Sequence, residues 1–173
     1  MAKKISLSRI SQGLALVEVL VAIVLIGIGI LGMAGLQVTG FRNTQQAVLA
    51  GQVSFMTSDI AERMRANPQA VDQGLYHLGN ANLHNECSSM AGCTVLQLAE
   101  TDMFEWNNFL ANNLVMGEGV VCVDGVPENN ATPNNPQCDN FIVGGNNPPY
   151  VVKIWWDRDL DGVQDQAYVI PIL

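Results

Sequence analysis

The sequence predicts an α+β protein in which a long N-terminal helix packs on a small antiparallel β-sheet head, with one extra short helix. Three observations predict this class. An apolar run fills residues 14–36, an amphipathic helical pattern continues over 37–66, and strand-like segments gather towards the C-terminus. The chain has 173 residues, so 67–173 leaves room for one modest globular domain.

The run at 14–36 is the apolar half of the predicted helix and contains one charged residue, Glu18. It is long enough to cross a bilayer, since a helix needs about 20 apolar residues to do so. The leader before it carries Lys3, Lys4 and Arg9, and this positive charge predicts a cytoplasmic N-terminus. A carboxylate costs about 2.5–3.5 kcal/mol at the centre of a bilayer, so we expect Glu18 to have a function.

Two simpler interpretations of this N-terminus remain open. A cleaved secretory signal has an apolar core of about 7–15 residues, and Gly32-Met33-Ala34 could serve as its cleavage site. The run is longer than that, and Glu18 interrupts it near its start. An uncleaved signal anchor explains the length and the orientation, but it does not explain the sequence Gly-Leu-Ala-Leu-Val-Glu at the boundary.

Beyond residue 36 the helical pattern becomes amphipathic. Apolar side chains recur at steps of four, three, four and four residues and form one stripe: Leu49, Val53, Met56, Ile60 and Met64. Asp59 and Arg63, between them, have the i,i+4 spacing of an acid–base pair. Pro68 ends the pattern, so we expect the helix to reach Ala66.

The segment 67–100 is expected to be irregular, with His77 and His84 as surface residues. A second helix is expected over 102–114, where Asp102 and Glu105 have the spacing of a capping-box variant. Its apolar side chains also recur at helical spacing: Met103, Trp106, Leu110 and Leu114.

Strands are expected at 120–124, 141–143, 150–156 and 167–173. The strongest is 150–156, which reads YVVKIWW, and its two tryptophans are interpreted as sheet packing. Pro171 would place the last strand at an edge of the sheet, because proline cannot donate to a neighbouring strand.

Charge and cysteine content limit the classes of function. Beyond the leader the chain has five basic and sixteen acidic residues, which argues against nucleic-acid binding. The four cysteines all follow the apolar run and indicate two disulfides in an oxidising envelope compartment. Of the three possible pairings we favour the one between sequence neighbours, Cys87–Cys93 and Cys122–Cys138. A zinc site using His77 and His84 with Cys87 and Cys93 does not have the usual ligand spacing.

The residues at 12–24, QGLALVEVLVAIV, resemble the class III signal of type IV pilins. The resemblance implies a pilin fold and a leader, 1–13, that a prepilin peptidase removes by cutting between Gly13 and Leu14. The same enzyme would methylate the new N-terminus at Leu14. Glu18 would then be the fifth mature residue, where the family carries a glutamate. The chain departs from the family at Leu14, usually Phe, and at Gly35, where major pilins commonly have proline.

Three further segments are similar to minor pilins of the PilV type: ILGMAGLQ at 30–37, DIAERMRANPQAV at 59–71 and ETDMFEWNNFLANNL at 100–114. The resemblance implies a minor pilin that primes type IV pilus assembly and joins the tip complex, supporting twitching motility and adhesion. Its partners would be other minor pilins, the major pilin, the prepilin peptidase, the inner-membrane assembly platform and a tip adhesin. The chain would cross the bacterial inner membrane once, with its head in the periplasm, before it entered the extracellular pilus.

Cleavage gives Glu18 a physical role. Removal of the leader creates a positive amine at Leu14, and inside an apolar bundle of helices that amine needs a counter-charge. The carboxylate of Glu18, in the same or a neighbouring subunit, can supply it. The alternative is that Glu18 is only an acid favoured by the dipole at the helix N-terminus.

Other functions remain as alternatives. A minor pseudopilin of a type II secretion system would share the signal and the helix, and a signal-anchored periplasmic binding domain would form no fibre. The sequence contains no G-x-S-x-G, H-E-x-x-H, P-loop or dinucleotide-binding motif, so we expect a protein that is not an enzyme and requires no cofactor.

An aspartate-rich stretch follows the strongest predicted strand. Its D-x-D-x-D-G pattern resembles the start of a calcium loop, with four candidate ligands: Asp157, Asp159, Asp161 and Asp165. The twelfth loop position is Tyr168 rather than the glutamate of an EF-hand. The stretch therefore predicts either a Ca²⁺ site or an acidic, solvated hairpin turn.

Overall fold

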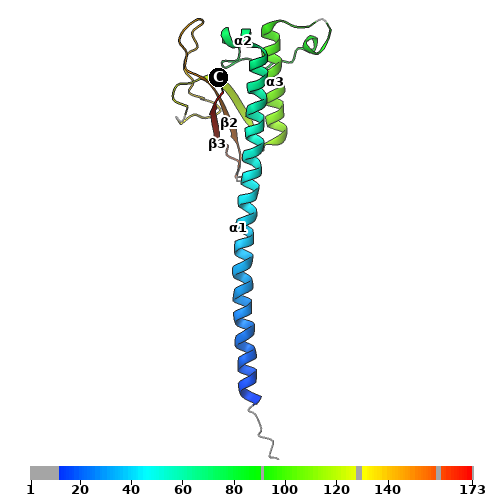
Figure 1. The fold of residues 1–173 in the computed structure, drawn as a ribbon, viewed down its shortest axis with the longest axis vertical. Helices are drawn as coiled ribbons and strands as arrows, with labels where there is room; N and C mark the ends of the chain where they lie inside the picture. The colour runs from blue at the N-terminus through cyan, green and yellow to red at the C-terminus, as the bar shows by residue number, and fades with distance from the viewer. Residues whose placement is uncertain (1–11, 91, 128–129, 159–160, 173) are drawn as a thin grey trace, which may run out of the picture. The chain divides into compact units, whose positions relative to one another are not determined.

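The computed structural model describes residues 12–90, 92–127, 130–158 and 161–172. The elements follow the chain in this order (Figure 1): α1 (Gln12–Ala66), α2 (Pro68–Asp72), the short 3₁₀ helix η1 (Asn85–Ser88), α3 (Val95–Asn113), β1 (Glu118–Val123), β2 (Tyr150–Trp156) and β3 (Asp165–Pro171). The chain divides into two compact units, Met1–Leu49 and Ala50–Leu173, and α1 contributes to both. We call the second unit the head. The predicted α+β class, with a long helix packed on a small antiparallel sheet, is confirmed.

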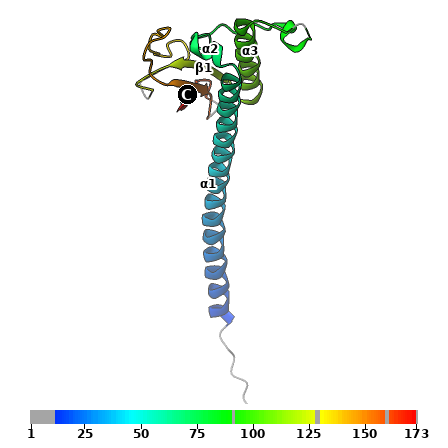
Figure 2. The same cartoon turned by 45° about the horizontal axis from the view of Figure 1, so that its top comes forward.

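The head is built around the last turns of α1. The predicted apolar stripe is buried from its second member onwards, with Val53, Ile60 and Met64 fully inaccessible and Met56 nearly so. Figures 1 and 2 show α3 running alongside these turns. The Trp106 indole Nε1 donates to the carbonyl oxygen of Met56 over 2.9 Å, so a side chain of α3 is fixed on the backbone of α1. The helix ends at Ala66, as predicted.

The sheet has three antiparallel strands in the order β1-β2-β3. β2 matches the predicted strand residue for residue, and all seven of its side chains are buried because it lies in the centre of the sheet. Pro171 lies in β3, an edge strand, where its missing N–H is tolerated. Gly119 of β1 lies against α3, since a Cβ there would come within 2.5 Å of both Trp106 and Leu110.

The strand predicted at 141–143 is wrong. These residues form a loop closed by Asn147, whose Oδ1 accepts from the Ile142 N–H over 2.9 Å and whose Nδ2 donates to the Ile142 carbonyl over 2.8 Å. One asparagine side chain therefore supplies both partners that a neighbouring strand would otherwise provide. Phe141 packs near Tyr150, with the ring centroids 6.1 Å apart.

The predicted start of the second helix is also wrong. α3 begins at Val95, where Thr94 and Gln97 form a capping box: the Thr94 hydroxyl accepts from the Gln97 N–H, and the Gln97 side chain accepts from the Thr94 N–H. Asp102 and Glu105 lie two turns inside the helix and both contact Arg63 of α1. The predicted apolar stripe of this helix is buried, as its spacing indicated: Met103, Trp106, Leu110 and Leu114.

The segment 67–100 is more ordered than expected. Pro68 opens α2, where its missing N–H costs nothing, and η1 carries the first cysteine of a disulfide. His77 and His84 are half-buried rather than surface residues. The His77 ring accepts the backbone N–H of Val123 over 3.0 Å, and His84 contacts Glu100 over 2.6 Å. Both rings are held by partners that are distant in the sequence. The periodicity of the sequence does not reveal such contacts.

Candidate functional site

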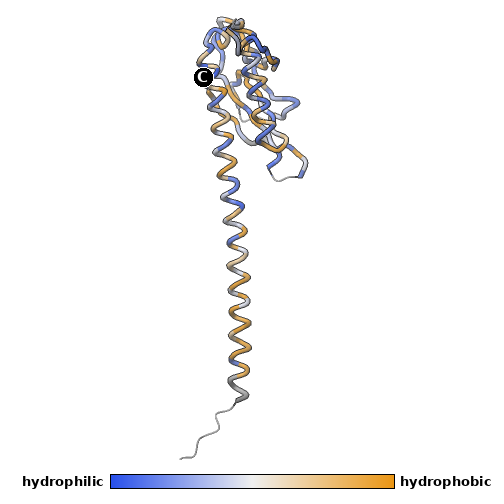
Figure 3. Tube along the Cα trace, turned by 90° about the vertical axis from the view of Figure 1, so that its right-hand side faces the viewer, coloured by the Kyte–Doolittle hydropathy of each residue, from blue (hydrophilic) through white to orange (hydrophobic). Residues whose placement is uncertain are grey.

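The first candidate site is the exposed surface of α1 in the unit Met1–Leu49. From residue 16 to 48 every described residue of this helix except the half-buried Gly27 is exposed, including large apolar ones such as Leu31 and Leu36, with 75% and 77% of their surface accessible. This is the one helix of the described chain long and apolar enough to cross a membrane, and none of its most apolar window is buried within the protein. Figure 3 shows this part of α1 mostly in the colour of hydrophobic residues.

The polar groups of this surface are few over 16–36 and frequent over 37–46. Thr39 and Thr44 turn their hydroxyls back to the carbonyl oxygens of Gly35 and Gly40, at 3.1 and 2.9 Å, so neither hydroxyl needs a partner outside the helix. The remaining charged groups are Glu18 and Arg42, and both are exposed. The apolar part of this surface, over 16–36, is suited to lipid or to other apolar helices and not to water.

The predicted cleavage site lies at the start of α1. The backbone of Gly13 and Leu14 belongs to the helix, which begins at Gln12, while the side chains of 12–15 lie outside the described residues. Most of the predicted leader, residues 1–11, lies outside the description as well. Glu18 follows Leu14 by four residues, which is about 6 Å along a helix axis and about one turn. A positive charge at the Leu14 amine and the Glu18 carboxylate would therefore lie on the same face of the helix.

Five glycines on this surface are not contacted by any other side chain. A Cβ built on any of five glycines would meet no atom within 4 Å, apart from the helix backbone itself: Gly27, Gly29, Gly32, Gly35 and Gly40. Glycine costs about 1 kcal/mol relative to alanine in a helix in water. Within this unit no side chain packs on these glycines to compensate for that cost.

Both disulfides in the structure have the pairing that we favoured from the sequence. Cys87 and Cys93 have Cα atoms 4.7 Å apart, and Cys122 and Cys138 have Cα atoms 6.0 Å apart. Because the four sulfurs are bonded in two pairs, no free thiolate is left to bind zinc at the alternative site. The first disulfide closes a short loop onto the start of α3, and the second ties β1 to the loop before β2.

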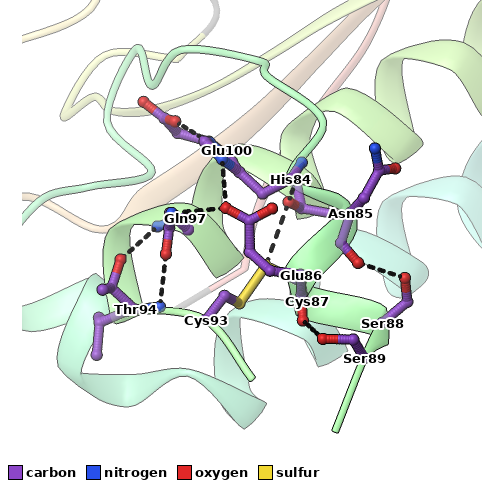
Figure 4. The surroundings of a disulfide bond; sticks show 12 residues. His84, Asn85, Glu86, Cys87, Ser88, Ser89, Cys93, Thr94, Gln97 and Glu100 are labelled. Atoms are coloured by element: carbon purple, nitrogen blue, oxygen red, sulfur yellow. Dashed lines mark hydrogen bonds and ion pairs between the residues drawn. A yellow bond between two sulfur atoms is a disulfide. The ribbon is translucent and has the colours of Figure 1, made fainter. Parts of the chain in front are cut away.

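The Cys87–Cys93 loop is held by a set of polar side chains (Figure 4). The Glu86 carboxylate accepts from the Gln97 side chain over 2.9 Å, and the two ring nitrogens of His84 lie 3.7 Å from Glu86 and 2.6 Å from Glu100. The carboxylates lie at opposite nitrogens of the ring, so they do not converge on one point. The arrangement fastens the loop to α3 and forms no metal-binding geometry.

A buried ion pair beside the second disulfide was not found from the sequence. The Lys153 ammonium in β2 donates to the Asp124 carboxylate and to the Pro136 carbonyl oxygen, the latter over 2.8 Å. The second Asp124 oxygen accepts from the Val126 N–H over 2.8 Å. Both side chains are almost fully buried. The available signal was a single lysine within the otherwise apolar strand YVVKIWW.

A second charged cluster joins α1 to α3. Arg63 contacts Asp59, Asp102 and Glu105, at 3.1, 3.3 and 2.6 Å, and Asp102 also accepts from the Tyr76 hydroxyl over 2.6 Å. Burial lowers the pKa of the Arg63 guanidinium, but the Glu105 hydrogen bond and the surrounding carboxylates raise that pKa above its ordinary value. Burial raises the pKa of the Asp102 carboxyl, although its bonds to Tyr76 and Arg63 act against the shift. The cluster orients the head helices.

Burial also shifts the pKa values of two ring side chains near β1 and β2, His77 and Tyr150. Burial lowers the pKa of His77, whose Nδ1 must be unprotonated to accept the Val123 N–H. Burial, with the nearby charge of Asp72, raises the pKa of the Tyr150 hydroxyl to about 12. That hydroxyl stays protonated and donates to the Val71 carbonyl oxygen over 3.1 Å.

The aspartate-rich stretch is described only in part. Asp159 and the side chain of Asp165 lie outside the described residues. The Asp157 carboxylate accepts from the N–H groups of Asp161 and Gly162, at 3.2 and 2.9 Å, and Asp161 accepts from Val163 over 2.8 Å. These bonds are those of an Asp-initiated turn, and no group of three candidate metal ligands occurs among the described residues. Calcium binding stays a prediction.

Comparison with known protein families gives one match. Residues 35–104 match the family model Tt1218-like, described as Type IV pilin Tt1218. The match spans about two fifths of the chain and runs from the apolar half of α1 to the middle of α3. No curated protein and no solved structure matches the chain. The match supports a type IV pilin, and the exposed apolar helix fits anchoring in a membrane.

Proposed function

We propose that this protein is a minor pilin of a type IV pilus, with a structural role in priming assembly and in the tip complex. The observation that carries the proposal is the exposed, largely apolar surface of α1 over 16–48, in which no described residue is buried. The family match supports the pilin class. The PilV-like segments at 30–37, 59–71 and 100–114 support the minor type, with twitching motility and adhesion as the processes it serves.

In this function the bilayer holds the helix until assembly. A prepilin peptidase removes 1–13, methylates Leu14 and leaves a positive amine at that residue. When the helix leaves the lipid for a bundle of other pilin helices, the Glu18 carboxylate neutralises this amine. Breaking a buried charge pair by removing one partner typically costs about 3–5 kcal/mol.

The variant Glu18→Ala tests this role against a matched control, Glu18→Asp, which keeps the charge. We expect Glu18→Ala to be processed and held in the membrane but poorly incorporated into pili, and Glu18→Asp to retain much more incorporation. The measurement is the amount of the chain in sheared fibres relative to the membrane fraction. Normal incorporation of Glu18→Ala would show that the carboxylate has no role in assembly.

The same fractions separate the pilus from the pseudopilus of a type II secretion system. A pilin is recovered from sheared extracellular fibres, and its deletion reduces surface fibres and twitching. A pseudopilin leaves fibres intact and its deletion blocks secretion of folded proteins. Recovery in neither fraction, with an uncleaved N-terminus, would favour a signal-anchored binding domain.

A further inference from the structure

The buried Lys153 ammonium depends on the loop that follows β1. Lys153 lies in β2, the central strand, and is fully inaccessible to solvent. One of its partners, the Asp124 carboxylate, comes directly after β1. The other, the Pro136 carbonyl oxygen, is 2.8 Å from the ammonium nitrogen and belongs to the loop stretch 130–138. This stretch takes the place of water at the charge, so Lys153 stays buried only while the stretch remains on the sheet.

The Cys122–Cys138 disulfide fixes this stretch on the sheet. Cys122 lies in β1 and is fully buried, whereas Cys138 lies at the end of the stretch and is half-buried. The Cys138 sulfur lies 3.7 Å from the Pro136 carbonyl oxygen, so the covalent bond to β1 sets the place of the oxygen that Lys153 needs. The link also removes in advance the entropy that an open loop would lose when it docks. The disulfide and the buried charge therefore depend on each other.

Two hydrogen bonds beside the disulfide also hold the end of the stretch. Asp139 donates its N–H to the Val123 carbonyl oxygen over 2.9 Å, and its carboxylate accepts from the Gly125 N–H over 2.7 Å. Asp139 and Gly125 are exposed, and hydrogen bonds in exposed segments open most readily. Once the disulfide is reduced, bonds of this kind must hold the stretch against the free energy that Lys153 gains on hydration.

The helices of the head have contacts of their own. The Trp106 indole of α3 donates to the Met56 carbonyl oxygen of α1 over 2.9 Å, and Arg63 of α1 contacts two carboxylates of α3. The edge of β1 that faces away from β2 is covered at Val121, whose carbonyl oxygen accepts from the Leu78 N–H over 2.9 Å. None of these contacts involves the stretch. It can therefore leave the sheet while α1, α3 and β1 keep their contacts.

We infer that the Cys122–Cys138 disulfide is a redox-sensitive switch: its reduction releases the stretch 130–138 and exposes Lys153, while the helices of the head stay folded. The chemistry is thiol–disulfide exchange with a dithiol. A thiolate attacks the more accessible sulfur, that of Cys138, the S–S bond breaks, and the Cys122 sulfur leaves with the electron pair and takes a proton. The second thiol of the dithiol then attacks the mixed disulfide. It frees Cys138, which takes a proton, and the dithiol becomes a disulfide.

The Cys87–Cys93 disulfide provides the internal comparison. Both of its cysteines are half-buried, so a dithiol should reduce it at a lower concentration than the disulfide at the fully buried Cys122. The charged groups beside it, His84 and Glu86, have 24% and 47% of their side-chain surface accessible. Water can therefore replace any partner that they lose. Reduction of this disulfide should leave Lys153 buried.

The switch links the state of the head to the compartment that the head occupies. Disulfides form and persist in oxidising envelope compartments and are rare in a reducing cytoplasm. Before oxidation the stretch would stay open and Lys153 would stay hydrated, and oxidation would close the stretch over the charge. This inference concerns the head alone and goes beyond the proposed pilin function, so the failure of one does not decide the other.

Lysine labelling tests the switch directly, because Lys153 is the one lysine beyond the leader. The full chain in detergent micelles is treated with an amine-reactive acetyl ester at increasing concentrations of dithiothreitol. Mass spectrometry then measures acetylation of Lys153 and alkylation of each cysteine, and amide hydrogen exchange follows α3. We expect acetylation to rise at least about tenfold once Cys122 and Cys138 are alkylated. It should stay at its initial level while only Cys87 and Cys93 are alkylated.

Two serine pairs give matched variants. Cys122→Ser/Cys138→Ser should be acetylated at Lys153 without reductant, whereas the control Cys87→Ser/Cys93→Ser should be acetylated only after reduction. The titration of the parent decides by itself if a serine pair fails to accumulate. Lys153 that stays unlabelled after reduction of Cys122–Cys138 would overturn the inference. Hydrogen exchange in α3 that rises together with acetylation would overturn it too, because the whole head would then have unfolded.

Discussion

The two halves of α1 share one backbone conformation but differ in where their partners are. Over 50–66 the helix buries an apolar stripe, with Val53, Ile60 and Met64 inaccessible to solvent inside the head. Over 16–48 it exposes a longer apolar surface, and no described side chain of that half is buried. The first pattern is that of a helix whose partner belongs to the same chain. The second is that of a helix whose partner is lipid or another molecule.

The charged residues show the same contrast. Lys153 in the head is fully buried and has Asp124 and a backbone carbonyl oxygen as partners. Arg42 on α1 is exposed and has no ion-pair partner among the described residues. Lys153 is thus paired within the fold, whereas Glu18 and Arg42 have no ion-pair partner among the described residues. Paired substitutions, one in each half of α1 or one in each unit, test whether the two regions differ in this way.

The largest effect is expected when a charged side chain of the head, Lys153, is replaced by methionine and compared with the same replacement of Arg42 on the exposed half of α1. Lys153→Met leaves the buried Asp124 carboxylate unpaired and should lower the free energy of unfolding of the head by about 3–5 kcal/mol. Arg42→Met should leave that free energy unchanged, because Arg42 is exposed and has no ion-pair partner among the described residues. The measurement is denaturant unfolding of the full chain in detergent micelles, followed by tryptophan fluorescence. Equal stability of Lys153→Met and the parent would contradict the role of the pair.

The same isoleucine-to-alanine change should distinguish the two halves of α1. Ile60→Ala creates a cavity in the head and should cost about 2–5 kcal/mol of its unfolding free energy. Ile26→Ala removes an exposed side chain and should not affect the head at all. Its effect, if helices pack on this surface, is a lower ratio of fibre-bound to membrane-bound chain. Unfolding of the head shifted by Ile26→Ala would show that the exposed half has an internal partner.

Two glycine-to-alanine substitutions, one in each region, should change the unfolding free energy by a smaller amount. A methyl group at Gly119 would collide with Trp106 and Leu110, so Gly119→Ala should destabilise the head by about 1–3 kcal/mol. A methyl group at Gly35 meets nothing inside the chain, so Gly35→Ala should leave the head unchanged and favour the helix by up to about 1 kcal/mol. If incorporation of Gly35→Ala into fibres falls despite this gain, helices of other subunits approach closely there. Unchanged incorporation would place Gly35 away from such contacts.

The smallest effect concerns pH and should be confined to the head, since residues 16–49 contain no histidine. Burial lowers the pKa of His77 from 6.5 in the folded state. Below pH 6.5 the unfolded chain therefore binds this proton more readily, and stability present at higher pH is lost as the pH falls. Protonation also breaks the bond from the Val123 N–H. His77→Gln, which keeps an acceptor, should reduce the slope of unfolding free energy against pH between 5 and about 6.5.

The elements that depend on local pattern could be predicted from the sequence. The apolar run, the stripe from Val53 to Met64, the end of α1 at Ala66 and the strand β2 all follow from spacing and from proline. The start of α3 could not be decided in this way, because T-x-x-Q at Thr94 and D-x-x-E at Asp102 both resemble a capping box. Contact with Arg63, far away in the sequence, places Asp102 inside the helix instead.

For the candidate site, the sequence predicts a role for Glu18, since a charge within an apolar run stands out, and a cut before Leu14, and both stay predictions. It missed Lys153, whose partner Asp124 comes from another strand end, and it placed His77 and His84 on the surface.

The mass of the mature chain, measured in sheared fibres, tests whether this protein is processed and assembled as a pilin. We expect a chain that lacks residues 1–13, begins at Leu14 and carries one added methyl group at its amine. A chain that begins at Gly35, after cleavage behind Ala34, or one that retains Met1, would contradict it, because neither would place an amine one turn before Glu18.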